Sequence, residues 1–274
     1  MSARVALAFT FAVGWATLCG AGDPASAAAA LRADTVRAFE QYVGIAETRV
    51  DERARGSRPF LWIDEGGARR KRVRAGEILV EKSGVDEPME VPGGLVHDWI
   101  GAVFVPGATL DRTLALLQDY DHHERVYRPE VMASRLIARN GDRFTAYLRL
   151  RKKKLVTVVL DTEHEARYVR LDRERSYSMS RSTRIAEVEN AGTPGERTLP
   201  EGADHGYLWR LNSYWRLLEA DGGVYVECQA VSLTRGIPVG LGWLIGPIIS
   251  SLPRESLART LAATLDGLAK SPGG

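Results

Sequence analysis

The spacing of hydrophobic and polar residues changes several times along the chain, and each spacing predicts a different element. Near the start, Val36, Phe39, Val43 and Val50 recur at helical intervals and define one apolar stripe. Asp34 stands just before this stripe, where its carboxylate can cap the first turn. The segment is therefore predicted to be an amphipathic helix.

Two short strands are predicted after this helix, because apolar runs at 60–63 and 77–80 flank a glycine-containing loop and a basic segment. Prolines and glycines between residues 88 and 94 then mark a boundary. We expect residues 28–94 to form an extension, made of a helix and a hairpin, in front of a main domain at 95–274.

The main domain is predicted to begin with a strand at 97–105, which is apolar at almost every position and therefore suits burial on both faces. Thr109 can cap a following helix in which Leu110, Leu114 and Leu117 share one side.

Strand signals then dominate for about a hundred residues. Tight-turn residues occur at Asn140-Gly141 and at Asp221-Gly222-Gly223, and each is expected to join two strands into a hairpin. The predicted strands are 131–138, 142–151, 155–171, 177–188, 206–218 and 224–234.

The strand at 206–218 carries aromatic and basic residues in alternation. One face holds Tyr207, Trp209, Leu211, Ser213, Trp215 and Leu217, and the other holds Arg210, Asn212 and Arg216. We expect the tryptophans to line a core or a cavity and the arginines to face away. Glu227, on the next strand, is expected on the outer side.

The last part of the chain combines a glycine-rich apolar run at 240–249 with a helix over 253–269, which Pro253 is expected to open. The glycine spacing, G-x-G-x-x-x-G, is one residue too long for a dinucleotide-binding loop, and no strand follows to complete such a unit. The run is therefore expected to be either a flexible loop at a cavity mouth or an ordinary packed connection.

This order of elements indicates an α+β fold, because consecutive antiparallel strands are followed by a separate terminal helix. It resembles the helix-grip fold of the START-like superfamily, which includes lipid-transfer domains and polyketide cyclases. The resemblance covers about residues 95–270 and depends on the element order, on Pro129 before the second strand, and on the terminal hairpin and helix. It implies a curved antiparallel sheet of about seven strands wrapped around the C-terminal helix, with an elongated apolar cavity between them.

The resemblance also implies residues for such a cavity. Candidates for its wall or gate are Trp99, Trp209, Leu211, Trp215, Trp243, Leu244, Ile248, Leu257 and Leu261. Arg184 and Arg235 are candidates for orienting a polar ligand head, on the condition that a partner such as Glu227 compensates a buried charge.

The N-terminus has the three parts of a secretory signal peptide, with one arginine, an apolar run and small residues that end at Ala27. Cleavage after Ala27, which takes residues 1–27 away from 274, would leave 247 residues and Cys228 as the single cysteine. A lipid-modified Cys19 is the less favoured alternative. We therefore expect a secreted or periplasmic protein that forms no intramolecular disulfide.

Other chemistries find little support in the sequence. The net charge of +2 selects no polyanionic partner, and the basic run 149–154 lacks the interleaved aromatic residues of a nucleic-acid site. That run is expected to be a solvated sheet edge or to contact a membrane surface transiently. His122, His123 and His164 are expected at a solvated helix end and on an exposed strand, so no metal or other cofactor is predicted.

Catalytic residues are not predicted either, because there is no G-x-S-x-G motif and Cys228 lies among apolar neighbours where its thiol stays protonated. The alternating serines 176–182 are expected to form a polar strand face. We thus favour a protein that binds a hydrophobic small molecule or lipid. The alternatives are a cyclase- or aromatase-type enzyme that uses the same cavity, and an interaction module with a filled core.

Overall fold

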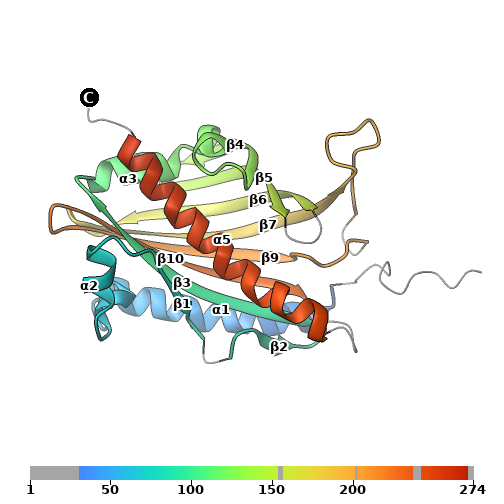
Figure 1. The fold of residues 1–274 in the computed structure, drawn as a ribbon, viewed down its shortest axis with the longest axis horizontal. Helices are drawn as coiled ribbons and strands as arrows, with labels where there is room; N and C mark the ends of the chain where they lie inside the picture. The colour runs from blue at the N-terminus through green and yellow to red at the C-terminus, as the bar shows by residue number, and fades with distance from the viewer. Residues whose placement is uncertain (1–30, 85, 154–156, 201–202, 237–241, 271–274) are drawn as a thin grey trace, which may run out of the picture.

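The computed structural model describes residues 31–84, 86–153, 157–200, 203–236 and 242–270, with no description of the side chains of 242–250. The signal peptide predicted over residues 1–27 lies outside this part of the chain. Two long helices lie on opposite sides of one large antiparallel sheet (Figure 1).

The helices are α1 (Ala33–Ala54), η2 (Trp62–Asp64), α2 (Arg69–Arg74), α3 (Leu110–Gln118), η3 (Tyr120–His122), α4 (His123–Val126) and α5 (Gly242–Lys270), of which η2 and η3 are 3-10 turns. The strands are β1 (Leu79–Lys82), β2 (Met89–Val91), β3 (Gly94–Pro106), β4 (Val131–Asn140), β5 (Arg143–Lys153), β6 (Thr157–Arg170), β7 (Arg175–Glu189), β8 (Arg197–Thr198), β9 (Arg210–Ala220) and β10 (Gly223–Arg235).

The sheet has ten strands in the order β1-β3-β10-β9-β7-β6-β5-β4, with β2 paired to β3 and β8 paired to β7. Seven of the strands are long, and β1, β2 and β8 are short additions at its borders. The sheet is curved and does not close, and α5 crosses it diagonally from one end to the other (Figure 1). This arrangement confirms the predicted α+β helix-grip fold with seven main strands.

The inner face of the sheet, which we define as the face toward α5, holds the first part of the core. Val103, Leu217 and Val226 come from three adjacent strands and form one cluster with Leu257 and Leu261 of α5. Because side chains alternate along a strand, every second residue of β3, β9 and β10 must therefore belong to the opposite face.

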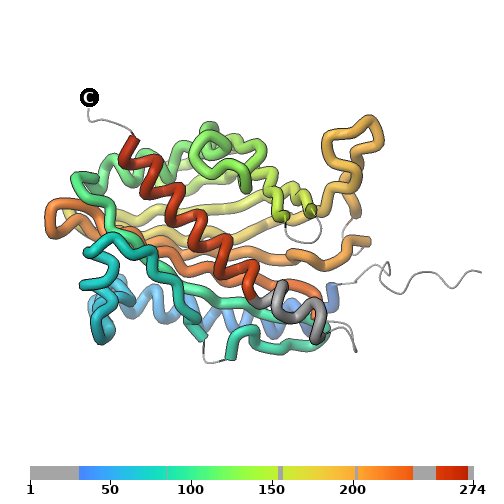
Figure 2. The backbone as a smooth tube through the Cα atoms, viewed as in Figure 1, coloured from blue at the N-terminus to red at the C-terminus, as the bar shows by residue number. Residues whose placement is uncertain are grey.

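The outer face is covered by the N-terminal segment. Phe39 and Val43 of α1 pack on Val96, Tyr214 and Leu233, and a second cluster under η2 and α2 continues this layer along the sheet. The backbone trace shows α1 behind the sheet and α5 in front of it (Figure 2). The central strands are thus buried on both faces, which explains the apolar character of β3 that the sequence showed.

A glycine sets the distance between α5 and the sheet. A Cβ atom on Gly101 of β3 would lie 2.8 Å from Leu261 Cδ1 and 2.8 Å from the backbone oxygen of Leu79. Any larger residue would push α5 or the edge strand β1 away, since real Cβ contacts are longer than this. Gly101 therefore allows the helix to seat directly on β3.

Two predicted elements differ from the structure. The segment at 60–63 is not a strand, and its last two residues lie in the 3-10 turn η2. Leu61, Trp62 and Ile63 bury their side chains against the outer face of the sheet but do not pair with any strand. The glycine-rich run that we expected to be a loop lies mostly within α5, which begins at Gly242, so Pro253 is inside the helix and does not open it.

The outer face also contains a buried ion pair. Arg216 Nε donates to Glu227 Oε1 at 2.6 Å, and the two residues are 1% and 0% exposed. Glu227 Oε2 additionally accepts the backbone N–H of Ile63 at 3.3 Å. Alternation placed these residues on the face opposite Trp215, as predicted, but the N-terminal segment covers that face and the charges do not reach solvent.

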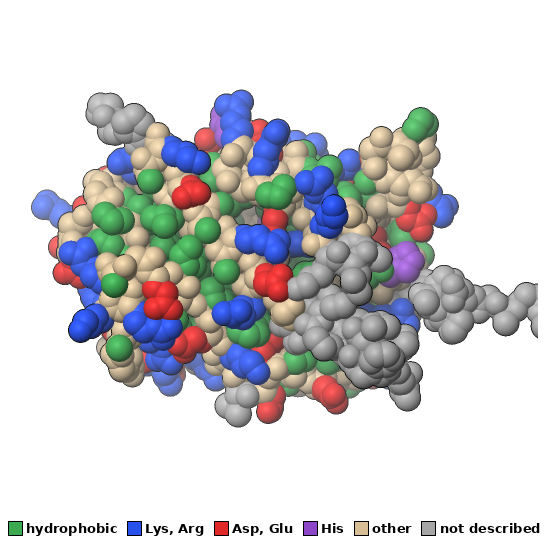
Figure 3. Space-filling model, in the orientation of Figure 1, with side chains coloured by type: hydrophobic (Ala, Val, Ile, Leu, Met, Phe, Trp, Pro, Cys, Tyr) green, Lys and Arg blue, Asp and Glu red, His purple; other side chains and the backbone are tan. Residues whose placement is uncertain are grey.

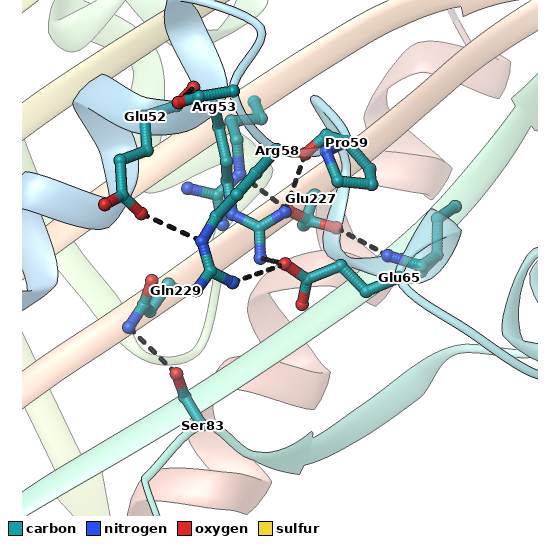
Figure 4. A network of polar contacts seen from close by, with 11 residues as sticks. Glu52, Arg53, Arg58, Pro59, Glu65, Ser83, Glu227 and Gln229 are labelled. Carbon is teal, nitrogen blue, oxygen red and sulfur yellow. Dashed lines mark hydrogen bonds and ion pairs between the residues drawn. The ribbon is translucent and has the colours of Figure 1, made fainter.

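A wider polar network surrounds this pair (Figure 4). Arg53 of α1 donates to the backbone oxygen of Pro59 and forms an ion pair with Glu65 at 2.9 Å. Burial and the neighbouring Arg216 lower the pKa of Arg53, and Glu227 and Glu65 oppose that shift. The network therefore connects α1 and the η2 segment to the middle of the sheet.

We predict that Glu227→Gln lowers the free energy of unfolding by about 3–5 kcal/mol, because Arg216 would keep a buried charge without its partner. The double variant Arg216→Met/Glu227→Gln should recover much of this loss. Arg184→Gln, which breaks an exposed pair with Glu163 at 3.6 Å, is the matched control and should cost about 0–1 kcal/mol. Urea unfolding measures all three, and a small effect of Glu227→Gln alone would contradict the prediction.

Candidate ligand-binding site

The inner face of the sheet is only partly covered by α5. The helix contacts chiefly β3, with smaller contacts to β10 and β1, and it reaches β5 through Lys152, which donates to Ser256 at 2.7 Å. Leu148, Ser180, Ser213 and Trp215 lie on the inner face of central strands, and yet each remains partly accessible. The helix therefore does not seal these four inner-face positions.

The floor of this space is built from small residues. Ala166, Ser180, Ser213 and Ala230 are direct neighbours across four adjacent strands, β6, β7, β9 and β10. A second row, Tyr168, Ser178 and Trp215, runs beside it. Small side chains in the middle of a curved sheet leave room that larger ones would occupy.

The walls of the space are apolar. Leu148, Ile185 and Leu211 pack partly buried around the fully buried Leu160, and Ala263 of α5 joins the same cluster. Trp215, at the end of the second row, packs against the cluster that contains Leu257 and Leu261. We call this partly accessible part of the inner face, with small and partly polar residues in its middle and apolar residues around them, the enclosure.

A surface cleft of about 480 Å³ opens between α3 and the ends of β5 and β6. It reaches Phe144, Tyr168 and Ser176 on the inner face, and Arg139 and Arg170 stand at its rim. Arg170 forms an ion pair with Asp111 of α3 at 2.6 Å, which links the two sides of the rim. On the α5 side of the molecule, hydrophobic side chains gather toward the end that holds α3, with charged groups around them (Figure 3).

His164 lies in the floor, on β6, and is 6% exposed. Its Nε2 is 3.0 Å from Thr162 Oγ1, and that hydroxyl donates its own hydrogen to the backbone oxygen of Leu148 at 2.9 Å. Nε2 must therefore be the donor, which leaves a lone pair on Nδ1. Burial lowers the pKa of His164 to about 4, so the ring is neutral at pH 7.

The position of His164 differs from the prediction of an exposed strand, because its strand is covered on the inner side. The four serines 176–182 likewise lie on the inner face and not on a solvated one. Their alternation was visible in the sequence, but only the pairing of Ser178 with Trp215 shows that they share a face with the core.

Five of the predicted wall residues lie on the inner side as expected. They are Trp99, Leu211, Trp215, Leu257 and Leu261. Trp209 does not share this face, because it precedes β9 and packs with Phe39 and Val43 of α1 while its Nε1 donates to Asp204 at 2.9 Å. The side chains of Trp243, Leu244 and Ile248 lie outside the described residues.

The predicted orienting arginines are not in the site. Arg184 is exposed beside Glu163, and Arg235 is the last residue of β10, where strand alternation assigns it to the outer face. Glu227, which we considered as their partner, pairs with Arg216. The polar groups in the middle of the inner face are thus neutral hydroxyls and an imidazole.

Other candidate groups have structural partners. His123 is buried, with a pKa lowered to about 4 by burial, and its Nε2 is 3.2 Å from the backbone oxygen of Leu117. His122 pairs with Asp119 at 2.9 Å at the solvated helix end. Across the described ranges, no group of three or more His, Cys, Asp and Glu side chains is placed to hold a metal ion.

The basic run and the cysteine are also accounted for. Arg149 pairs with Asp161 and Glu196, and the partly buried Lys152 pairs with Glu130, so these two side chains are not free at a sheet edge. Contact of the remaining run with a membrane stays a prediction.

Cys228 is free and buried, and burial raises the pKa of its thiol, which agrees with an inert role. None of the described helices is long and apolar enough to span a membrane.

No family model matches the sequence, and no curated protein sequence is significantly similar to it. Solved structures do match. A STAR-related lipid transfer protein from Xanthomonas axonopodis is 20% identical, over 70% of this chain and 99% of that one, with a TM-score of 0.43. The Zhui aromatase/cyclase from Streptomyces sp. R1128 is 12% identical, over 65% and 99%, with a TM-score of 0.47.

Human STARD10 is also 12% identical, over 74% of this chain and 80% of that chain, with a TM-score of 0.42. The chain has a START-like helix-grip fold. At these identities the likeness concerns the fold alone.

The buried histidines predict a pH dependence of stability. The pKa values of His164 and His123 are near 4 in the folded chain and about 6.5 when unfolded, so protonation favours the unfolded state. The free energy of unfolding should fall as the pH drops from 6.5 toward 4, by about 1.4 kcal/mol per pH unit for each histidine. Urea unfolding at several pH values measures the slope.

His164→Gln should reduce this slope by about half, because one of the two titrating groups is removed. His122→Gln, at the exposed helix end, is the control and should leave the slope unchanged. Equal slopes in the wild type and His164→Gln would show that His164 is not a buried neutral histidine.

Proposed function

We propose that the chain binds a hydrophobic small molecule or lipid in the space between the inner face of the sheet and α5. The observation that carries the proposal is the partial accessibility of Ser180, Ser213 and Trp215 on the inner face of β7 and β9, although the neighbouring strands β3 and β10 are buried on both faces. A filled core would have sealed these side chains. The interaction-module alternative is therefore the weaker one.

The chemistry of the enclosure suits such a ligand. Apolar walls gain about 25 cal/mol for each Å² of apolar ligand surface that they remove from water. A few polar groups in the floor can set the orientation, as in most small-molecule sites. The cleft beside α3 lies at one end of the enclosure and supports entry from that side.

Tyr168 is the inner-face residue that bears most directly on the cyclase-type alternative, because its phenol could act as an acid or a base. Its hydroxyl donates to the backbone oxygen of Leu117 at 2.9 Å and lies 3.0 Å from the hydroxyl of Tyr120. Burial raises the pKa of Tyr168 well above its usual value, so the phenol stays protonated. These bonds hold the phenol to the α3 segment, and we therefore favour binding over acid–base catalysis.

The proposal includes a location outside the cytoplasm, after cleavage of the signal peptide behind Ala27. Intact-mass analysis of the protein purified from its own host should give a chain that lacks residues 1–27. Native mass spectrometry of the same sample should also retain a bound small molecule. A full-length intact mass would contradict the cleavage.

We predict that Ser180→Leu weakens binding of a neutral apolar dye, N-phenyl-1-naphthylamine, because the larger side chain fills the floor of the enclosure. The affinity should fall by at least about tenfold, because an extra side chain occupies the space of the ligand. Thr145→Leu adds a similar side chain on the outer face of β5 and is the control that should bind normally.

Dye fluorescence titration measures the affinity, and circular dichroism checks that both variants are folded. Equal binding by the wild type and Ser180→Leu would place the dye outside the enclosure and contradict the proposed site.

A further inference from the structure

A strip of polar groups without protein partners crosses the floor of the enclosure. It consists of His164 Nδ1 on β6, Ser178 and Ser180 on β7, and Ser213 on β9. We call it the polar strip. His164 and Ser178 are only 6% and 3% exposed, yet His164 Nδ1 and the Ser178 hydroxyl have no hydrogen-bond partner among the described residues.

These groups are not sealed inside the protein. Within the described part of the chain, Arg216 Nη2, on the outer face, is the one fully enclosed side-chain nitrogen or oxygen atom without a partner. His164 Nδ1 and the Ser178 hydroxyl must therefore be accessible from the enclosure. A polar group with this degree of burial requires a partner, which must be water or a ligand.

The hydrogen bonds that His164 already makes decide whether its free ring nitrogen must donate or accept. Thr162 fixes the His164 tautomer with hydrogen on Nε2, so Nδ1 can only accept. A ligand group that satisfies Nδ1 must carry a hydrogen to donate, as a hydroxyl does. Ser182, directly across from His164, already accepts from the backbone N–H of Leu211. The hydroxyls of Ser180 and Ser178, one and two inner-face positions farther along β7, can both donate and accept, and therefore suit further oxygen atoms of a ligand.

The polar strip is also uncharged, and so are its inner-face neighbours Ala166, Tyr168 and Trp215. Two charged residues near one end of the enclosure already have partners, and Arg139, at the rim of the cleft, donates to the backbone oxygen of Gly141 and does not reach the polar strip's strand positions. Lys152 pairs with Glu130, and Glu187 accepts from the backbone N–H groups of His205 and Tyr207. An anionic ligand head at the polar strip would therefore lack a counter-charge, which makes its burial costly.

We infer that the polar strip selects an uncharged, largely apolar alcohol, whose hydroxyl donates to His164 Nδ1, over fatty acids and other anionic lipids. This inference depends on the proposed function and specifies its ligand class. The alcohol can be long-chain or polycyclic, since the strip defines the polar end of the ligand and the apolar walls accept either hydrocarbon frame.

Three matched probes test the inference on the wild-type protein by displacement of N-phenyl-1-naphthylamine. They are 1-dodecanol, its methyl ether, which accepts but cannot donate a hydrogen bond, and dodecanoate. The alcohol should bind about fivefold more tightly than the ether, because only the alcohol satisfies His164 Nδ1. Dodecanoate at pH 7 should bind at least about tenfold more weakly than the alcohol.

The variant His164→Phe shows whether His164 causes the preference for the alcohol over the ether. His164→Phe keeps a ring in the floor but removes the acceptor, so the preference for alcohol over ether should fall to less than about twofold, with little change in the affinity for the ether. His122→Phe, at the exposed helix end, should keep the full preference. If His164→Phe does not fold, the three probes on the wild-type protein still test the inferred ligand class.

The outcomes separate the two proposals. Failure of the dye and of every probe to bind overturns the proposed function itself. Binding of the dye with equal affinity for alcohol and ether, or with dodecanoate as tight as the alcohol, leaves the proposed function in place and overturns this inference.

Discussion

The ion pair between Arg216 and Glu227 determines which face of the sheet carries charge. Both residues lie in the middle of the sheet, where alternation sends them to the face opposite Trp215, and burial requires them to be paired. The N-terminal segment covers this pair, and the contact of Glu227 with the backbone of Ile63 ties that segment to the strands. Because the outer face holds these charges, the central inner face can remain neutral.

That neutrality gives the inner face its chemical character. Glycine at position 101 seats α5 closely on β3, while the strands farther along the sheet carry small residues and stay uncovered by the helix. One side of the enclosure is therefore tightly packed, and the other retains space. His164 and the serines place hydrogen-bonding groups in that space without adding charge, so the same sheet combines a rigid core with a selective floor.

Much of the fold could be predicted from the chain, because strong turn residues and helical spacing are local signals. Asn140-Gly141 and Asp221-Gly222 do form the expected turns, and Thr109 does cap α3 by accepting from the backbone of Arg112. The errors occurred where burial overrides the local pattern. The apolar residues Trp62 and Ile63 belong to the 3-10 turn η2 under the sheet. Glycines and prolines at the end of the chain did not prevent α5 from beginning at Gly242.

The sequence by itself determined the kinds of element, their order, and the division of strand residues such as Arg216 and Trp215 into opposite sets. It did not determine which set faces α5, because the N-terminal segment covers the outer face of β3, β9 and β10 and α5 covers the inner face. Tertiary structure decided that Trp209 belongs with α1, that His164 is buried, and that Ser178 lies beside Trp215. These facts depend on the register between β7 and β9, which are distant in the chain, and on the helices that cover each face. Local spacing contains no information about either.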